Sequence, residues 1–463
     1  MAPTPARPLD RRSFLREAGA QVGLLAAGGR GLPGWLGSPA LVSRSPEIVV
    51  IGAGAFGGWT ALHLRKMGAS VTLVDAYGPG NSRSTSGDES RGIRSSYSDR
   101  LTWVRLASQA ITRWKEWDRE WAKPFRMQLF FPTGDLILRA APEPIITATR
   151  ASWDTLGLAY QTPSVDDVRR EYPQINCEGI TLALFEPDAG VVRARRSCEV
   201  VAEAFRQEGG KIVLARAAPG SAEGGRLRQV TLDTGQTLGA DLFVFACGPW
   251  LPKVLPDVMT DRLRTPLGRV IYFGTPPGDQ RFTFPHLPSF NFPGVTGWPG
   301  LGPDNRGFRV RGAGGNRAAR DGPGAGVEGA GDEAGRQPAL PPRPPTPPEQ
   351  LDPDLSSRWV PPEAHAGPRA FLAARFPALA DAPIVATHAC HYESSVDRNP
   401  IVDRHPGLDN AWIAGGGSAE GFKLGPVIGE YIARRVLSKR TEPELDQQFR
   451  LKDEKFEAQS ETR

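Results

Sequence analysis

The sequence predicts an α/β fold whose central parallel sheet is assembled from distant parts of the chain. Two segments support this prediction, because each runs from an apolar strand through a glycine-rich turn into an apolar-striped helix. They are residues 48–75 and residues 410–437. Strands without polar residues are typical of parallel sheets that are covered on both faces. Two such segments can face one ligand only if the domain that contains them is discontinuous.

The first segment contains a dinucleotide-binding fingerprint. Gly52, Gly54 and Gly57 give the pattern G-x-G-x-x-G between a predicted strand and a predicted helix. The first glycine permits a tight turn, the second lets a pyrophosphate approach the backbone, and the third lets helix and strand pack closely. Asp75 follows the next predicted strand, where it can accept a hydrogen bond from a ribose hydroxyl. This acid disfavours a 2′-phosphate, so NAD or FAD is preferred to NADP; a turn without a ligand is the alternative.

The second glycine-rich turn favours FAD over NAD. This turn, at residues 415–417, lies far from the first along the chain. A domain that binds NAD rarely needs such an interruption, whereas a large, permanently held FAD does. The sequence therefore predicts that FAD occupies the first turn and that the second turn faces the same cofactor.

Composition limits the remaining classes of protein. A chain of 463 residues is too long for one compact core and predicts two domains or more. Its 40% hydrophobic and 23% charged residues are typical of a globular protein. The net charge of +5 comes with scattered basic residues, so no nucleic-acid partner is expected. The four cysteines form no C-x-x-C pair and no apolar run is long enough for a membrane span, so neither a metal site nor an integral membrane segment is expected.

The N-terminal segment predicts export. Arg11 and Arg12 are followed by Phe14 and Leu15, and then by a weakly apolar stretch at residues 18–29. This order resembles a twin-arginine signal, whose pathway transports folded proteins. We therefore expect the export machinery as a partner and a periplasmic or extracellular location. A basic tail without a signal is the alternative.

Hydrophobic periodicity predicts further elements between the two glycine-rich turns. The predicted helices are residues 101–121, 165–172 and 198–207, and the predicted strands are residues 128–138 with a break at Gly134, 180–185, 211–214 and 242–246. Ser164 is the expected N-cap of the second helix. A hairpin is expected around Thr234 and Gly235.

Seven blocks of sequence, taken together, resemble one family of flavoenzymes. In chain order they are GAGAFGG, VDA, SGDESRGIR, DAGVVRARR, ADLFVFACGPW, ACHYESSVDRNPIVDRHP and GGGSAEGFKLGPVIGE. This order resembles the D-amino-acid oxidase superfamily of FAD-dependent oxidoreductases. Within the superfamily it is most similar to the group of monomeric sarcosine oxidase and N-methyltryptophan oxidase. The resemblance covers residues 46–440, apart from residues 311–350.

The resemblance implies a fold and an activity. The implied fold is α/β, with a discontinuous Rossmann-like FAD-binding domain and an α+β substrate domain on a mixed sheet. The expected ranges are 1–45 for the signal and spacer, 46–100, 186–255 and 386–440 for the FAD domain, 101–185 and 256–385 for the substrate domain, and 441–463 for a tail. The implied reaction oxidises the C–N bond of a secondary or N-methyl amino acid, or a related amine, by hydride transfer to flavin.

Residues 311–350 depart from the family. They are almost free of aromatic and β-branched residues, a composition that cannot bury a core and predicts disorder. The segment is either a flexible insertion or an out-of-frame reading of a GC-rich gene.

The resemblance also implies residues of the substrate site. Arg94 and Lys423 match the pair that binds the substrate carboxylate, and a guanidinium is a natural bidentate partner for that group. Tyr97 is expected in the same pocket, with ordinary aromatic packing as the alternative. Arg309 stands where the oxidases keep a lysine beside flavin N5 to activate oxygen. The histidine expected four residues later is replaced by Ala313.

A larger set of residues is implied to bind the cofactor. Cys390 stands where the family attaches FAD through a thioether to the 8α-methyl carbon, with a buried free cysteine as the alternative. The implied FAD-binding residues are Gly52, Ala53, Gly54, Gly57, Asp75, Ala76, Ser90, Arg91, Ala218, Gly248, Trp250, Cys390, Gly416, Gly417, Gly421 and Lys423.

Three functions remain open at this point. The first is an FAD-dependent amine or amino-acid oxidoreductase that passes electrons to oxygen. Arg309 and the predicted export favour the second, in which the flavin passes electrons to another acceptor such as a quinone or a carrier protein. The third is an FAD-binding protein without turnover, in which residues 311–350 remove part of the pocket.

Overall fold

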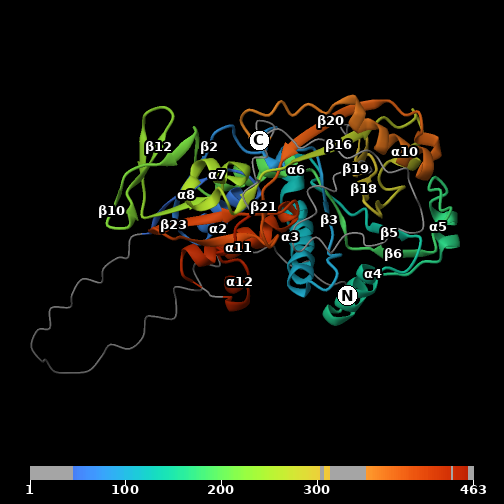
Figure 1. Cartoon of the computed structure of the whole chain (residues 1–463), viewed down its shortest axis with the longest axis horizontal. Coiled ribbons are helices and arrows are strands. Elements are labelled where there is room, and N and C mark those ends of the chain that lie inside the picture. Colours follow the sequence, from blue (N-terminus) through green and yellow to red (C-terminus); the bar gives the residue numbers. More distant parts are fainter. Residues whose placement is uncertain (1–44, 303–306, 313–350, 440–441, 457–463) are drawn as a thin grey trace, which may run out of the picture. The chain divides into compact units, whose positions relative to one another are not determined.

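The computed structural model describes residues 45–302, 307–312, 351–439 and 442–456 (Figure 1). The predicted twin-arginine signal and residues 313–350 of the predicted disordered segment lie outside these ranges. The described residues form one compact unit. Within the described residues, no helix is both long and apolar enough to cross a membrane.

A six-stranded sheet unites the two glycine-rich segments. Its strand order is β22-β23-β14-β1-β2-β8. The strands are β1 (Glu47–Ile51), β2 (Ser70–Asp75), β8 (Lys211–Leu214), β14 (Leu242–Phe245), β22 (Ile401–His405) and β23 (Leu408–Gly415). All neighbours are parallel except β22 and β23. The prediction of a parallel sheet built from distant segments is therefore confirmed, and β14 lies between the strands of the two segments.

A seven-stranded mixed sheet forms the second large layer, in the order β20-β16-β19-β18-β17-β5-β6. Its strands are β5 (Asp135–Arg139), β6 (Leu182–Glu186), β16 (Leu267–Phe273), β17 (Ser289–Phe292), β18 (Val295–Trp298), β19 (Phe308–Gly312) and β20 (Ile384–His391). Only β5 and β17 pair in parallel. The mixed sheet confirms the predicted fold class. The predicted domain limits stay a prediction, and the one at residue 386 falls inside β20.

Short strands form smaller sheets around these two. They are β3 (Arg91–Ile93), β4 (Phe130–Phe131) and β7 (Gly190–Val192) in one sheet, β9 (Ala217–Pro219), β12 (Gln229–Leu232) and β13 (Thr237–Gly239) in another, and the pairs β10 (Ala222–Glu223) with β11 (Arg226–Leu227) and β15 (Leu263–Arg264) with β21 (Ser394–Ser395). The predicted hairpin around Gly235 is present, because β12 pairs antiparallel with β13.

The helices largely follow the predicted periodicity. They are α2 (Ala55–Lys66), α3 (Leu101–Phe125), α4 (Pro144–Leu156), α5 (Val165–Glu171), α6 (Ala194–Gln207), α7 (Leu251–Val254), α8 (Pro256–Met259), α10 (Ala366–Arg375), α11 (Gly421–Val436) and α12 (Pro443–Gln448). Ser164 caps α5 as predicted, since its hydroxyl accepts a hydrogen bond from the backbone N–H of Asp167 at 3.1 Å. Helices α4, α7, α8, α10 and α12 are absent from the prediction, and α6 begins four residues earlier than predicted.

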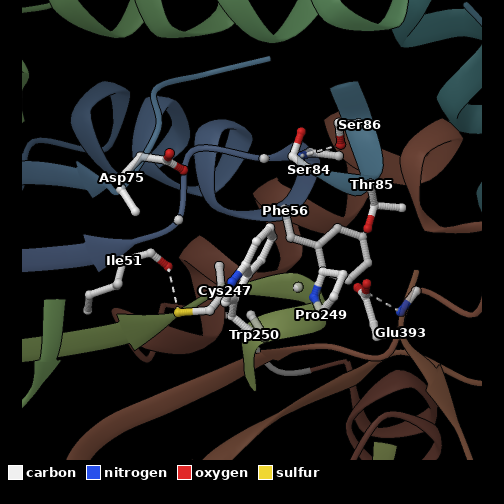
Figure 2. A pocket seen from close by; sticks show the side chains of 18 of the residues that line it. Ile51, Phe56, Asp75, Ser84, Thr85, Ser86, Cys247, Pro249, Trp250 and Glu393 are labelled. Atoms are coloured by element: carbon white, nitrogen blue, oxygen red, sulfur yellow. Dashed lines mark hydrogen bonds between the residues drawn. The ribbon is translucent and has the colours of Figure 1, made fainter. Parts of the chain in front are cut away.

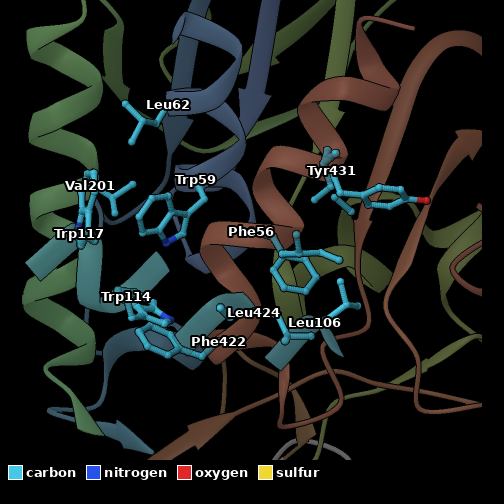
Figure 3. Close-up of a cluster of buried hydrophobic side chains, with 14 of the residues drawn as sticks. Phe56, Trp59, Leu62, Leu106, Trp114, Trp117, Val201, Phe422, Leu424 and Tyr431 are labelled. Carbon is cyan, nitrogen blue, oxygen red and sulfur yellow. The ribbon is translucent and has the colours of Figure 1, made fainter. Parts of the chain in front are cut away.

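Aromatic packing fixes α11 against α2 and α3 (Figure 3). The Trp59 ring of α2 lies 4.6 Å from the Trp117 ring and 5.5 Å from the Trp114 ring of α3. Gly425 and Gly429 of α11 face Trp59 so closely that a Cβ atom on either would lie within 2.7 Å of it. The two glycines therefore allow α2 and α11 to pack tightly, which sets the N-termini of both helices in place.

Candidate active site

The first glycine-rich turn has the geometry that its fingerprint predicts. Gly52 has a φ of +103°, and a Cβ atom there would lie 2.3 Å from the carbonyl oxygen of Ala246. A Cβ atom on Gly57 would lie 1.9 Å from the carbonyl oxygen of Gly52. Real Cβ atoms do not approach a carbonyl oxygen so closely. Both positions therefore require glycine, one for its backbone conformation and one for close packing of α2 on β1.

Asp75 holds this turn from the end of β2. One carboxylate oxygen accepts a hydrogen bond from Ala53 N at 2.7 Å, and the other accepts from Tyr77 N at 2.9 Å and Gly78 N at 2.8 Å. Burial raises the pKa of the Asp75 carboxyl, against the opposing effect of these three hydrogen bonds. A carboxylate has about four acceptor positions, so Asp75 retains capacity for a ribose hydroxyl.

One pocket brings together both glycine-rich turns (Figure 2). The predicted FAD-binding residues that line it are Gly52, Gly54, Asp75, Ala76, Arg91, Ala218, Gly248, Trp250, Gly417 and Gly421. The predicted FAD-binding residues outside the lining are Ala53, Gly57, Ser90, Cys390, Gly416 and Lys423. The structure therefore brings together segments that are far apart in the sequence. Ala53 and Gly57 stabilise the turn instead of lining the pocket, Ala53 through its hydrogen bond to Asp75 and Gly57 through close packing on Gly52.

The lining fits a flavin dinucleotide. Helices α2 and α11 both begin at the pocket; α2 has no acidic residue in its first turn, and the N-cap residue of α11, Glu420, is paired with Lys423. Their N-termini favour the negative charge of a pyrophosphate. In Figure 2, Asp75 and Glu393 lie on either side of Phe56 and Trp250. The Oε2 atom of Glu393 is buried and has no hydrogen-bond partner among the described residues, so a ligand can meet a polar group there.

Cys390 lies on β20 and does not itself line the pocket, but it contacts a lining residue, Arg91. Its sulfur accepts a hydrogen bond from Nη2 of Arg91 at 3.4 Å, and Arg91 itself lines the pocket. The thiol is 9% exposed. Arg91 also donates to the backbone oxygen of Thr85 at 2.7 Å, so its guanidinium connects the cysteine to the loop that precedes β3.

Asp88 is the centre of a buried ionic network. It pairs with Arg91, accepts a hydrogen bond from Nη2 of Arg309 at 3.0 Å, and accepts another from Tyr272 OH at 2.8 Å. Burial alone would raise the pKa of the Asp88 carboxyl, but Arg91 and Arg309 hold it well below its usual range. The Arg309 guanidinium also stacks at 3.9 Å from the Trp298 ring. Arg309 is thus buried and charge-paired, and it is absent from the lining of the pocket.

A second polar cluster lies at the start of α11. Lys423 pairs with Glu420 and donates to Tyr97 OH, while Tyr97 OH donates to Glu420 Oε2 at 2.8 Å. Burial alone would raise the pKa of Glu420, but Lys423 and then Arg94 hold it well below its usual range. Burial lowers the pKa of Lys423, against the opposing effect of Glu420. The structure therefore brings Arg94, Tyr97 and Lys423 together, as predicted, and adds Glu420.

Two buried carboxyl groups face each other beside this cluster. Asp135 of β5 and Glu186 of β6 are directly paired across the two strands. Oε1 of Glu186 accepts hydrogen bonds from the Ser95 hydroxyl at 2.7 Å and from Ser95 N at 2.8 Å. Burial and, to a smaller extent, the Asp135 carboxyl together raise the pKa of Glu186 to about 7, against the opposing hydrogen bonds from Ser95. The nearby charge of Arg94 acts in the opposite direction on both carboxyl groups.

Replacing Glu186 with glutamine is expected to change how stability depends on pH. A carboxyl group whose pKa is higher in the folded than in the unfolded protein stabilises the fold at pH values below the pKa that the group has in the unfolded state. This contribution is lost as the pH rises to the pKa that the group has in the folded state. From about pH 4.5 to about pH 7, the wild type should lose stability on the order of 3 kcal/mol relative to Glu186→Gln. Urea unfolding of both proteins across this range measures the difference.

Glu203→Gln is the matched control for this measurement. The hydrogen bond from Arg206 lowers the pKa of Glu203, so this carboxyl titrates below the measured range, and its difference from the wild type should stay nearly constant between about pH 4.5 and pH 7. A difference between wild type and Glu186→Gln that stays constant with pH would contradict the raised pKa of Glu186.

Sequence reasoning missed five acidic residues of the site. Asp88 and Glu420 lie inside two of the blocks that resemble the family, in SGDESRGIR and GGGSAEGFKLGP. Glu420 lies three positions before Lys423 at a helix start, a spacing that predicts an ion pair. Glu393 lies inside a third block, ACHYESSVDRNPIVDRHP, whereas Asp135 and Glu186 gave no such signal, because the strand register brings them to the site.

Comparison with known proteins agrees with this geometry. A family model described as FAD dependent oxidoreductase matches residues 47–435. The chain is 25% identical to a monomeric sarcosine oxidase from a Bacillus species, over 86% of this chain and 94% of that protein. It is 24% identical to N-methyl-L-tryptophan oxidase from Citrobacter koseri, over 84% of this chain and 93% of that protein.

Solved structures show the same fold. The modified fructosyl peptide oxidase from Aspergillus nidulans is similar with a TM-score of 0.70, at 18% identity over 88% of this chain and 94% of that one. The pocket uses residues from both glycine-rich turns, and the family model spans most of the chain. The chain therefore belongs to the family of FAD-dependent oxidoreductases, and it is an FAD-dependent amine or amino-acid oxidoreductase.

Proposed function

We propose that the enzyme oxidises the C–N bond of a secondary or N-methyl amino acid, or of a related amine. One observation supports this most strongly: a single turn contributes to both the cofactor pocket and the polar cluster. Gly417 and Gly421 line the pocket, while Glu420 and Lys423 of the same turn meet Tyr97. A substrate held by this cluster would therefore lie against the cofactor. When bound, FAD accepts the hydride that leaves the substrate.

The relatives support the proposed substrate class. Sarcosine and N-methyl-L-tryptophan, which name two of them, are both N-methyl amino acids. In the enzyme, the polar cluster would bind and orient the substrate. Tyr97 is 8% exposed and Lys423 is 6% exposed, so both groups are shielded from bulk water. Hydrogen bonds and charge interactions are stronger in such a buried site than in water.

Oxygen uptake, together with dye reduction, tests the reaction and the acceptor. We expect purified holoenzyme to consume a secondary amine from a panel of N-methyl amino acids and N-methyl amines. Oxygen uptake with peroxide formation would identify an oxidase. Failure of every amine to reduce either oxygen or an artificial acceptor would contradict the proposal and favour a flavin-binding protein without turnover.

The charge pairing of Arg309 supports a second candidate, a dehydrogenase that uses an acceptor other than oxygen. Its guanidinium donates to Asp88 at 3.0 Å and stacks on Trp298. A cation whose charge is compensated in this way contributes less to the stabilisation of negative charge that develops on oxygen. Dye reduction much faster than oxygen reduction would support this candidate.

Cys390→Ser is expected to make the flavin dissociable. We propose that Cys390 bears the flavin through a thioether, and its hydrogen bond to the pocket residue Arg91 supports this role. After acid precipitation, the wild-type pellet should retain yellow material, whereas the Cys390→Ser pellet should be colourless. Cys198→Ser is the control, because Cys198 is a buried thiol on α6 outside the lining. Wild-type flavin found entirely in the supernatant would contradict the thioether.

We further propose that the enzyme is exported in its folded state. The support is the sequence alone, in which Arg11 and Arg12 precede Phe14 and Leu15. Cell fractionation should recover the protein outside the cytoplasm, and replacement of both arginines with lysine should retain it inside. Cytoplasmic recovery of the unaltered chain would contradict export.

A further inference from the structure

The polar cluster at the start of α11 already contains a carboxylate. Lys423, the residue expected to bind the substrate carboxylate, is paired with Glu420 of the same turn. Tyr97 OH donates to the same Glu420 oxygen at 2.8 Å. The Lys423 side chain is 7% exposed and that of Glu420 is 18% exposed, so solvent does little to weaken this pair.

The other cations of the cluster also interact with carboxyl groups of the chain. Arg94 and Arg311 both lie near enough to Glu420 for their charges to act on it. Arg94 interacts in the same way with Asp135. The charge of Lys423 is therefore paired within the protein, and Glu420 and Asp135 offset part of the charge of the two arginines.

A substrate carboxylate placed against Lys423 would meet Glu420. Two carboxylates that share one buried site cannot both stay ionised without a large cost. Either the substrate group would displace Glu420 from Lys423, or one of the two carboxyl groups would have to bind a proton. Displacement would leave the Glu420 charge in a partly buried position without its main partner, which is also costly.

We propose that Glu420 is a specificity-determining residue that provides, from the chain itself, the carboxylate that Lys423 binds. This inference rests on the proposed function and narrows its substrate class. The preferred substrate is a secondary amine with no carboxylate on the carbon next to nitrogen, such as an N-methyl amine that bears alkyl, aryl or amide groups. A site whose lysine is paired with a carboxylate also repels an amine that arrives as an ammonium ion less than a site with an unpaired lysine would.

Binding of acetate and acetamide to the holoenzyme tests this role. The two probes have similar shape and differ in charge, and perturbation of the visible flavin spectrum measures their dissociation constants. The wild type should bind acetate less than about ten-fold more tightly than acetamide. Glu420→Gln releases Lys423, so it should bind acetate at least about ten-fold more tightly than the wild type does, with acetamide binding little changed.

Glu430→Gln is the matched control, because Glu430 lies on the same helix and pairs with Arg113 and Arg434, whose side chains are more exposed than that of Lys423. It should bind acetate as the wild type does. The inference is overturned if the wild type prefers acetate to acetamide by about ten-fold or more, a comparison that needs no variant. It is also overturned if Glu420→Gln gains less than about ten-fold in acetate affinity.

These readings are independent of turnover. An enzyme that oxidises amines but binds acetate strongly would retain the proposed function and refute the role of Glu420. An enzyme that binds both probes as expected but oxidises no amine would refute the proposed function and leave the role of Glu420 in ligand selection.

Discussion

Gly57→Ala should yield protein that folds but is largely free of FAD. The new Cβ atom would lie 1.9 Å from the carbonyl oxygen of Gly52 and 3.0 Å from Cβ of Ala246. Since backbone atoms cannot yield as a flexible side chain can, α2 must move away from β1 and β14. That movement opens the turn on which the pyrophosphate is expected to rest. Overpacking of this kind costs roughly 1–3 kcal/mol, which corresponds to a loss of about ten- to hundred-fold in FAD affinity.

Gly58→Ala is the matched control on the same helix. Its Cβ atom would find no neighbour closer than 3.5 Å, which is ordinary van der Waals contact. Alanine is also a better helix former than glycine, by about 1 kcal/mol. Both substitutions are compared in the Cys390→Ser background, where the flavin is expected to be dissociable, by flavin content after purification and by FAD titration with fluorescence detection. Full retention of FAD by Gly57→Ala would contradict the assignment of this turn to the cofactor.

Asp88→Asn should lose a large part of the stability of the protein. The substitution keeps the shape of the side chain and an acceptor for Tyr272 OH, but it removes the charge that Arg91 and Arg309 share. Breaking a buried ion pair by removal of one partner costs about 3–5 kcal/mol, because the remaining charge is left buried without compensation. Here two guanidinium groups would face each other. The free energy of unfolding, measured in urea, should fall by that amount.

Asp279→Asn provides the contrast. Asp279 pairs with Arg281 at 2.7 Å at the surface of the protein, where solvent screens the charges, so its substitution should change stability little. Equal stability of the Asp88→Asn and Asp279→Asn proteins would show that the network around Asp88 does not stabilise the fold. The Asp88 variant should also have lower FAD content, since Arg91 lines the pocket.

The sequence predicted well those features that depend on short stretches of chain. The turn from Gly52 to Gly57, the strands beside it and the cap at Ser164 are local, and each was confirmed. Helix α4 was missed because its β-branched residues favour strand, although Pro144 at its start and Gly157 at its end, with a φ of +64°, are typical helix boundaries. Pro144 and Gly157 were therefore better indicators of this helix than its β-branched composition.

Long-range contacts set the limit for the active site. Arg309 was expected beside the flavin, and its actual partner, Asp88, is 221 residues away in sequence. The pairing of Asp135 with Glu186 depends on the register of β5 and β6, which periodicity does not determine. By contrast, the pairing of Glu420 with Lys423 depends only on helix geometry, and spacing alone could have predicted it.

Anaerobic titration of the purified holoenzyme with secondary amines tests FAD-dependent amine oxidation most directly. Without oxygen, a true substrate must leave the flavin reduced, so the visible absorbance should bleach in one turnover, in proportion to the amine added. Readmission of oxygen or addition of an artificial acceptor should restore the colour. The predicted result is complete bleaching by at least one secondary amine and none by the corresponding alcohol. Persistent colour with every amine, in protein that a chemical reductant bleaches fully, would contradict the assignment.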